Sequence, residues 1–152
     1  MGNNHSVKKH GQFDLRLMQM VTGYEPQSGD ILAEKLGASP STIRRHVNRL
    51  KKAGDLKVAA LVEPAKMGFQ IIVMIGLRIE HGKVATVAEV LKPIPNIKWL
   101  TITAGRFSMM IYAWFRSMDE MSDFNNKTLH TTDGIIEAET FICLHVEKGL
   151  HT

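Results

Sequence analysis

The stretch that decides the fold is Ser39-Pro40-Ser41-Thr42-Ile43-Arg44-Arg45-His46-Val47-Asn48-Arg49-Leu50-Lys51-Lys52, which holds five basic residues and no acidic one. Its first serine is a favourable N-cap, and proline suits the next position because its missing N–H would have no partner there. Ile43, Val47 and Leu50 recur at helical spacing, so one face is apolar and the opposite face is basic. We predict an amphipathic helix that binds anions, with a solvated basic face as the alternative.

The charge of the chain is unevenly distributed around this helix. Residues 1–62 contain ten Lys and Arg against five acids, or +5, whereas residues 63–152 contain nine against ten, or −1. These sums account for the net charge of +4. The basic excess therefore lies in the N-terminal part, which indicates a polyanion-binding module joined to a module with another task.

The composition is that of a globular protein, with 44% hydrophobic and 22% charged residues. No apolar run approaches the length of a bilayer span, and the polar segment 1–12 lacks the apolar core of a secretory signal. We interpret residues 1–12 as a flexible arm. Cys143 is the only cysteine, so an intramolecular disulfide is excluded and a cytoplasmic location without a membrane partner is expected.

Two further helices are predicted before the basic helix. Residues 13–22 carry an apolar stripe, and Ser28 is a candidate N-cap for a short helix over 29–36, in which Ile31, Leu32 and Leu36 are expected to be buried. Gly37 follows as a left-handed C-terminal residue, and only Ala38 separates it from the Ser39 cap. Two helices joined by such a tight turn predict a helix-turn-helix domain of the winged type over residues 13–55.

The rest of the chain has the pattern of an α+β domain. A linker strand is expected over 56–62, in a linker and turn region that covers 56–68. The pattern then predicts strands over 69–79, 97–103, 107–115 and 135–146, and helices over 84–91 and 118–129. The order is β-α-β-β-α-β, which is the ferredoxin-like arrangement, and it defines a second domain over 69–148.

The predicted sheet has one face that nothing in the chain covers. The strands over 69–79 and 107–115 are apolar at nearly every position, as expected when both faces are buried. The two helices cover one face, so we expect a second copy of the domain to cover the other, which makes a homodimer. Met109 and Met110 are candidate interface residues.

Several stretches together resemble the Lrp/AsnC family of bacterial and archaeal transcription regulators. They are residues 32–50, 60–68 (Ala-Leu-Val-Glu-Pro-Ala-Lys-Met-Gly), Thr103-Ala104-Gly105 and 134–140 (Gly-Ile-Ile-Glu-Ala-Glu-Thr). The resemblance covers nearly the whole chain. It implies a helix-turn-helix domain, a ferredoxin-like effector and assembly domain, and dimers that associate into octamers.

The resemblance also implies that a small molecule, usually an amino acid, binds between dimers near the turn that holds Gly105. The effector residues expected are Thr103, Ala104, Gly105, Arg106, Phe107 and Ser108. Members of the family commonly have acidic residues just after that glycine, whereas this chain has Arg106-Phe107-Ser108. An acidic partner for an amino group is therefore missing from the turn, and a different ligand or none remains an alternative.

The basic helix supplies the expected contacts with double-stranded DNA. The predicted DNA-binding residues are Ser39, Ser41, Thr42, Arg44, Arg45, Asn48, Arg49 and Lys52. Arg45 is the first candidate for a guanine contact because its planar fork matches O6 and N7. Arg44, Lys51 and Lys52 are expected to contact phosphates. A ligand-binding or assembly protein of the same fold, without specific DNA binding, is the alternative function.

No catalytic group of residues stands out, so an enzyme is not expected, and neither is a cofactor. The polar segment 130–133 resembles a catalytic cluster but lies at a turn, where capping is the ordinary role. Cys143 and His145 resemble half of a zinc site with no matching second pair. His46 lies on the core flank of the basic helix, which favours packing or a phosphate contact.

Overall fold

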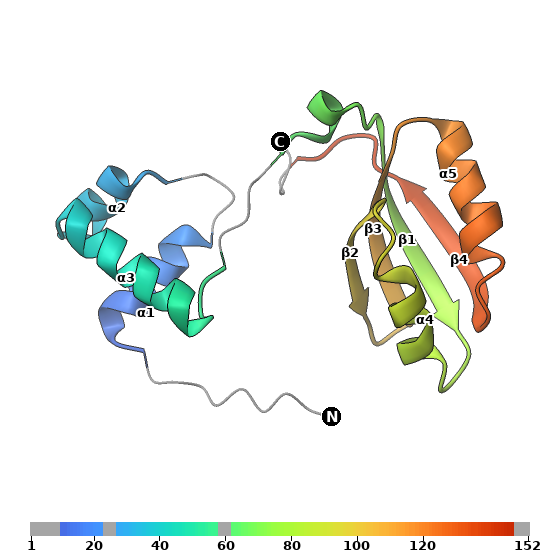
Figure 1. The fold of residues 1–152 in the computed structure, drawn as a ribbon, viewed down its shortest axis with the longest axis horizontal. Helices are drawn as coiled ribbons and strands as arrows, with labels where there is room; N and C mark the ends of the chain where they lie inside the picture. Colours follow the sequence, from blue (N-terminus) through green and yellow to red (C-terminus); the bar gives the residue numbers. More distant parts are fainter. Residues whose placement is uncertain (1–9, 23–26, 58–61, 148–152) are drawn as a thin grey trace. The chain divides into compact units, whose positions relative to one another are not determined.

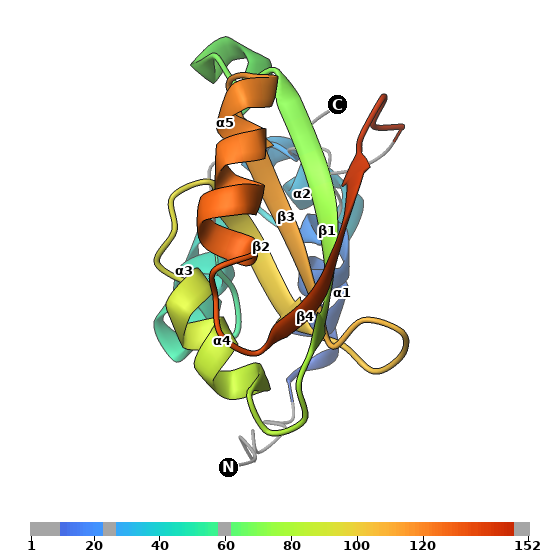
Figure 2. The same ribbon diagram turned by 90° about the vertical axis from the view of Figure 1, so that its right-hand side faces the viewer.

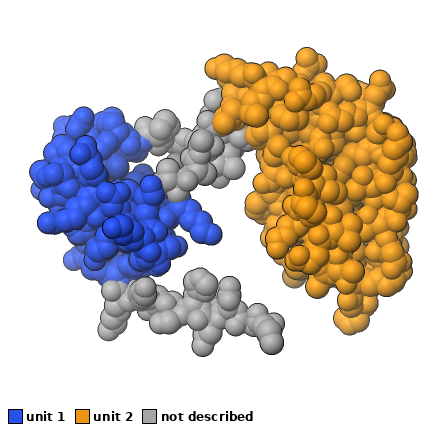
Figure 3. Space-filling model, in the orientation of Figure 1, with its two compact units in different colours: residues 1–60 blue, residues 61–152 orange. Residues whose placement is uncertain are grey.

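A computed structural model describes residues 10–22, 27–57 and 62–147. The chain divides into two compact units, residues 1–60 and residues 61–152, which Figure 3 draws in different colours. Each unit has its own apolar core. Among the described residues, no helix is long and apolar enough to cross a membrane.

The first unit consists of three helices, α1 (Gln12–Val21), α2 (Gly29–Leu36) and α3 (Pro40–Ala53). Both predicted serine caps are present. The Ser28 hydroxyl accepts a hydrogen bond from the Ile31 amide, and the Ser39 hydroxyl accepts one from the Thr42 amide. Gly37, at a φ of 61°, lets the chain leave α2 in the left-handed conformation, which permits the tight turn into α3.

The core of this unit is formed where the three apolar stripes meet. Its buried residues are Leu17, Leu32, Ala33, Leu36, Ile43 and Leu50. The prediction that Ile31 is buried is wrong, because its side chain is 43% exposed. Ile31 lies in the first turn of α2, adjacent in sequence to Leu32, and only the next position turns toward the core.

The expected linker strand over 56–62 falls partly on residues 58–61, which lie outside the described residues. The described neighbours Leu56, Lys57 and Val62 are not in a strand. A 3₁₀ turn follows at Pro64–Met67 and ends at Gly68. This turn leads directly into the sheet of the second unit.

The second unit is a four-stranded antiparallel sheet with helices on one face (Figures 1 and 2). The strand order is β2-β3-β1-β4. The elements are β1 (Ile71–Ile79), α4 (Val84–Leu91), β2 (Ile97–Ile102), β3 (Met109–Phe115), α5 (Met118–Phe124), a π-helical turn (Asn125–Leu129) and β4 (Ile135–Ile142). The predicted α+β class and the β-α-β-β-α-β order are confirmed. The strands are shorter than expected, and the predicted helix over 118–129 changes to the π-helical turn after Phe124.

The two faces of the sheet differ in what covers them. Val73, Ile75 and Leu77 of β1 are fully buried in the core beneath α4 and α5. The alternate residues form the outer face of the sheet, which we define as Ile72, Met74, Gly76, Trp99, Met110, Tyr112 and Trp114. Neither helix of the second unit lies on this outer face, because α4 and α5 both cover the opposite one (Figure 2).

The two adjacent methionines of β3 point to opposite faces of this sheet. Met109 is fully buried in the core, so its expected role at the interface is wrong. Met110 is opposite Gly76 in the register of β1 and β3, which places it on the outer face. The difference follows from the alternation of side chains along a strand, which puts only one of two neighbours on each face.

Candidate nucleic-acid interface and effector turn

The exposed face of α3 gathers most of the predicted DNA-binding residues around one open hollow. Its lining residues are Ser41, Arg44, Arg45, Asn48, Arg49 and Lys52. They lie opposite the buried Ile43 and Leu50, as the helical spacing requires. Four of the six are cationic, so positive charge is concentrated on this one face of α3.

The remaining two predicted residues lie at the start of α3. The Ser39 hydroxyl is 2.8 Å from the Ser41 hydroxyl and 2.9 Å from the Thr42 hydroxyl. Three hydroxyl groups thus surround the first turn, where free backbone N–H groups and the helix dipole favour an anion. The N-terminus of α3 and the basic hollow therefore form one continuous polar surface.

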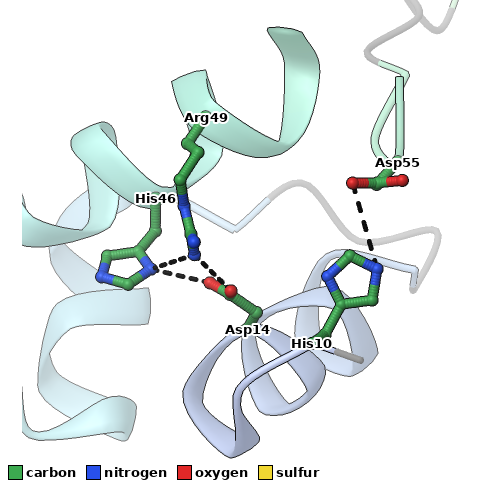
Figure 4. Close-up of polar contacts among 5 residues, drawn as sticks. All are labelled: His10, Asp14, His46, Arg49 and Asp55. Carbon is green, nitrogen blue, oxygen red and sulfur yellow. Dashed lines mark hydrogen bonds and ion pairs between the residues drawn. The ribbon is translucent and has the colours of Figure 1, made fainter. Parts of the chain in front are cut away.

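The cations of this surface differ in their partners. Arg44, Arg45 and Lys52 have no ion pair among the described residues, whereas Arg49 Nη2 is paired with Asp14 Oδ2 of α1 (Figure 4). The first three are therefore free to bind an external anion. Arg49 is held from within the molecule although its side chain remains 59% exposed.

Asp14 was not among the residues expected at this surface, yet it lies against α3. It is only 4% exposed, and its two carboxylate oxygens contact two residues of α3 (Figure 4). Oδ2 pairs with Arg49, and Oδ1 is 2.7 Å from His46 Nδ1. The His46 ring also packs against Phe13, with a centroid distance of 4.6 Å. The expected packing role of His46 thus comes with a polar contact that the helical spacing alone did not indicate.

Electrostatics fixes the protonation of this cluster. Burial by itself would raise the pKa of Asp14, but hydrogen bonds from His46 and Arg49, with the charges of Arg49 and His46, lower the pKa below its ordinary value. Asp14 is therefore ionised near neutral pH and acts only as an acceptor. Asp14 Oδ1 is therefore the acceptor in its contact with His46 Nδ1.

A polar contact also joins the segments that flank α1 and α3. His10, just before α1, has its Nε2 atom 3.9 Å from Asp55 Oδ2, just after α3 (Figure 4). Polar contacts thus connect α1 and the segment before it to α3 and the segment after it. They supplement the apolar core in fixing the orientation of α3 within its unit.

The turn between β2 and β3, which holds the predicted effector residues, is closed by its own hydrogen bonds. The Thr103 hydroxyl donates to the Phe107 carbonyl at 2.7 Å, and the Thr103 amide donates to the Ser108 carbonyl at 3.0 Å. The Ser108 amide donates to the Leu77 carbonyl of β1 at 2.8 Å. Ala104, Gly105 and Arg106 form the exposed tip, where Gly105 has a φ of 136°.

The cation at this tip turns toward two carboxylates of β4. Arg106 Nη2 is 2.9 Å from Glu139 Oε2 and 3.5 Å from Glu137 Oε1. Glu137 also pairs with Arg78 of β1 at 2.8 Å. The sequence placed no acid in the turn, but the fold brings two acids to it from a strand about 30 residues later. Glu137 and Glu139 were not among the residues expected at this turn.

The hypotheses of catalysis and metal binding gain no support from the described residues. The Thr131 hydroxyl donates to the Lys127 carbonyl and the Thr132 hydroxyl to the Thr128 carbonyl, so both cap the preceding turn. Asp133 pairs with Lys83. The described part of the chain contains no group of three or more His, Cys, Asp or Glu residues that could hold a metal ion.

Comparison with known families matches both units. The family described as "Lrp/AsnC ligand binding domain" matches residues 72–149. The family described as "HTH domain" matches residues 15–70. The first match covers about half of the chain, and the second covers α2, α3 and all but the first three residues of α1.

Individual relatives extend over both units. An HTH-type transcriptional regulator of Pyrococcus furiosus is 30% identical over 138 residues, which are 90% of this chain and 93% of the relative. The regulatory protein AsnC of Escherichia coli is 29% identical over 133 residues, which are 86% of this chain and 88% of AsnC.

Solved structures show the same fold. The structure of E. coli AsnC superposes with a TM-score of 0.73 at 24% identity and covers 92% of this chain and 95% of its own. A transcriptional regulator of Neisseria meningitidis, solved as a complex with L-Met, gives a TM-score of 0.77 at 23% identity, covering 93% and 94%.

A basic, capped recognition helix joined to a ferredoxin-like ligand-binding and assembly domain defines a class of protein, the effector-linked DNA-binding transcription regulators. The chain belongs to the Lrp/AsnC family of these regulators. The resemblance found in the sequence is confirmed.

Proposed function

We propose that this regulator recognises duplex DNA through the exposed face of α3, with the eight residues predicted from the sequence as its contact set. The observation that carries the proposal is the hollow around Arg44, Arg45 and Lys52, three cations without an ion pair among the described residues. A face whose charges are already paired would gain little binding free energy from a polyanion. Unpaired cations gain more, because counterions are released when they bind phosphates.

The roles divide by position on the helix. Arg45 and Asn48 lie near the centre of the exposed face, where side chains meet base edges, and an arginine fork matches guanine. Arg44 and Lys52 contact phosphates, and Ser39, Ser41 and Thr42 present hydroxyls to a phosphate at the N-terminus of α3. Residues 13–55 form the DNA-binding domain of this proposal.

The second domain, residues 69–148, assembles the protein through the outer face of its sheet, with residues 56–68 as the linker. Met74, Met110 and Tyr112 are half-buried there, on the face that α4 and α5 do not cover, and Trp99 is 49% exposed. A second copy would cover these side chains, and a two-fold pair would present two α3 helices to two half-sites. Association of such dimers into an octamer is the further step that the family resemblance implies.

An amino acid is the effector class that we propose for the turn from Thr103 to Ser108. The Neisseria regulator of the same fold is complexed with L-Met. In this chain, Arg106 offers a partner for a carboxylate, and Glu137 and Glu139 offer partners for an ammonium group. The missing acid of the turn is thus supplied by β4. The protein acts by binding and not by catalysis.

The decisive experiment is selection of binding sites from a random pool of DNA duplexes by the full-length protein, followed by titration of the selected duplex at several salt concentrations. A consensus sequence and an affinity that falls by orders of magnitude between about 50 and 200 mM salt are expected. Absence of an enriched consensus, with weak binding that does not change with salt, would instead favour an assembly or ligand-binding protein.

A further inference from the structure

We propose that Asp14 is a positioning residue for DNA recognition: it holds the Arg49 guanidinium of α3 in place before DNA arrives and keeps it there in the complex. The inference rests on the proposed DNA contact through α3. It adds a residue of α1 that lies outside the contact face itself.

The geometry joins one buried acceptor to two neighbouring turns of the recognition helix. Asp14 Oδ2 holds Arg49 Nη2 and Asp14 Oδ1 holds His46 Nδ1, so neither oxygen is left to solvent (Figure 4). The Phe13 ring packs on His46 and restricts its rotation. Because the carboxylate is fixed at both oxygens, the guanidinium that it binds has a defined place and orientation.

Burial argues that this pair persists when DNA binds. Asp14 is 4% exposed, and an ionised carboxylate at such a position is costly when it loses a charged partner. Departure of Arg49 toward a phosphate would leave only His46 to compensate the charge. Arg49 therefore stays, and it contributes to recognition from its anchored position.

Pairing with Asp14 leaves other N–H donors of Arg49 available for a contact with DNA. A guanidinium carries five N–H donors, and the contact with Asp14 engages Nη2 only. The side chain is 59% exposed and lines the same hollow as Arg45 and Lys52, so its outer edge faces the DNA-binding surface. Because the side chain is ordered in advance, less conformational entropy is lost when it contacts a base.

This role predicts an effect on specificity. Arg45 has no ion pair among the described residues and adjusts to the base that it meets, whereas Arg49 is limited to one place and tolerates fewer sequences. Loss of Asp14 would leave the charge of Arg49 intact but release its fork. Binding to phosphates would then persist, and discrimination at the base pair under Arg49 would be lost.

The experiment compares the consensus selected from a random duplex pool by full-length wild type, Asp14→Asn, Arg49→Ala and the double variant. We expect Asp14→Asn and Arg49→Ala to lose preference at the same base pair, with about tenfold weaker binding to the wild-type duplex. The double variant should match Arg49→Ala, because Asp14 acts only through Arg49. Thermal melting checks that each variant is folded.

Each other outcome has a distinct meaning. An unchanged consensus with uniformly weaker binding in Asp14→Asn would assign Asp14 a structural role only and overturn the proposal. Tighter binding would show that Asp14 withholds Arg49 from DNA, which also overturns it. If the wild type enriches no consensus, the proposed DNA recognition itself fails, which is a different result.

Arg49→Lys provides the second variant should Asp14→Asn not fold. Lysine keeps a cation beside Asp14, so the buried carboxylate remains compensated, but it lacks the planar fork. We expect Arg49→Lys to lose the same base preference as Arg49→Ala. Retention of the full consensus by Arg49→Lys would show that a positive charge suffices and that the positioning of a fork is not used.

Discussion

The ring of Phe107 lies directly over Gly76 of β1. A Cβ atom built on Gly76 would be 2.5 Å from Phe107 Cδ2 and 2.6 Å from Cγ, closer than real Cβ contacts allow. Phe107 belongs to the turn between β2 and β3, and Gly76 lies on the outer face of the sheet opposite Met110. Because Gly76 has no side chain, the Phe107 ring can pack against its backbone, and this contact anchors the turn.

Gly76→Ala is therefore expected to displace the Phe107 ring and to destabilise the second unit by about 1–3 kcal/mol through overpacking. Chemical denaturation measures this difference in the free energy of unfolding. In a Phe107→Ala background the methyl group has room, so Gly76→Ala should cost only a small fraction of the free energy that it costs in the wild type. Equal costs in the two backgrounds would show that the ring is not what the methyl group meets.

Acid should weaken the first unit through Asp14. The folded-state pKa of Asp14 is lowered from 3.8, so its contribution to stability is present above that value and is lost as the pH falls below 3.8 and through the folded-state pKa. Asp14→Asn should cost about 1–3 kcal/mol near neutral pH, and the difference from wild type should shrink in that acidic window. Denaturation followed by circular dichroism from pH 7 to about pH 3 measures it.

Glu34→Gln on α2 is the matched control for this acid prediction. Glu34 is exposed in the same unit and has no ion pair among the described residues. The difference in the free energy of unfolding between Glu34→Gln and wild type should stay constant over the pH range measured. A difference between Asp14→Asn and wild type that does not change with pH would contradict ionisation of Asp14 as the source of the effect.

Arg45 and Arg44 should respond differently to truncation although they are adjacent. Arg45→Ala is expected to lower affinity for the selected duplex by about 1–3 kcal/mol and to relax preference at one base pair. Arg44→Ala should weaken binding to all sequences alike and reduce the slope of affinity against salt by about one. Fluorescence titration at several salt concentrations separates the two. The reverse assignment would place the base contact on Arg44.

The outer face of the sheet should hold two chains together. Light scattering is expected to show at least a dimer of about 34 kDa, twice the chain mass of 17.0 kDa. Met110→Glu places a charge on that face and should shift the protein toward the monomer. Val90→Glu on α4 is the control, because Val90 is 50% exposed but α4 covers the opposite face. A monomeric wild type at micromolar concentration would contradict the assembly.

An effector amino acid should raise the melting temperature of the second unit. A ligand at 100 times its Kd stabilises the folded state by about 2.7 kcal/mol, which a thermal-shift screen of the twenty amino acids detects. Arg106→Ala should abolish the shift, whereas Lys127→Ala, on the π-helical turn, should preserve it. No shift with any amino acid, while DNA binding is intact, would favour another ligand or none.

The sequence by itself determined the elements whose causes are local. Ser28, Ser39 and Gly37 are capping residues wherever they meet a helix end, and both serine caps and the left-handed glycine are present in the structure. The period of Ile43 and Leu50 placed the basic face of α3 outward. The strands over 69–79 and 107–115, apolar at nearly every position with only two helices to cover them, predicted a sheet with one uncovered face.

Only the tertiary structure decided which charged side chains meet. Asp14 is 32 positions before His46 and 35 before Arg49, and no pattern within one helix relates residues so far apart. Arg106 meets Glu137 across 31 positions, and Phe107, in the turn between β2 and β3, covers Gly76 of β1. Local pattern fixes the direction of a side chain relative to its own element, but a pair across elements depends on how those elements pack.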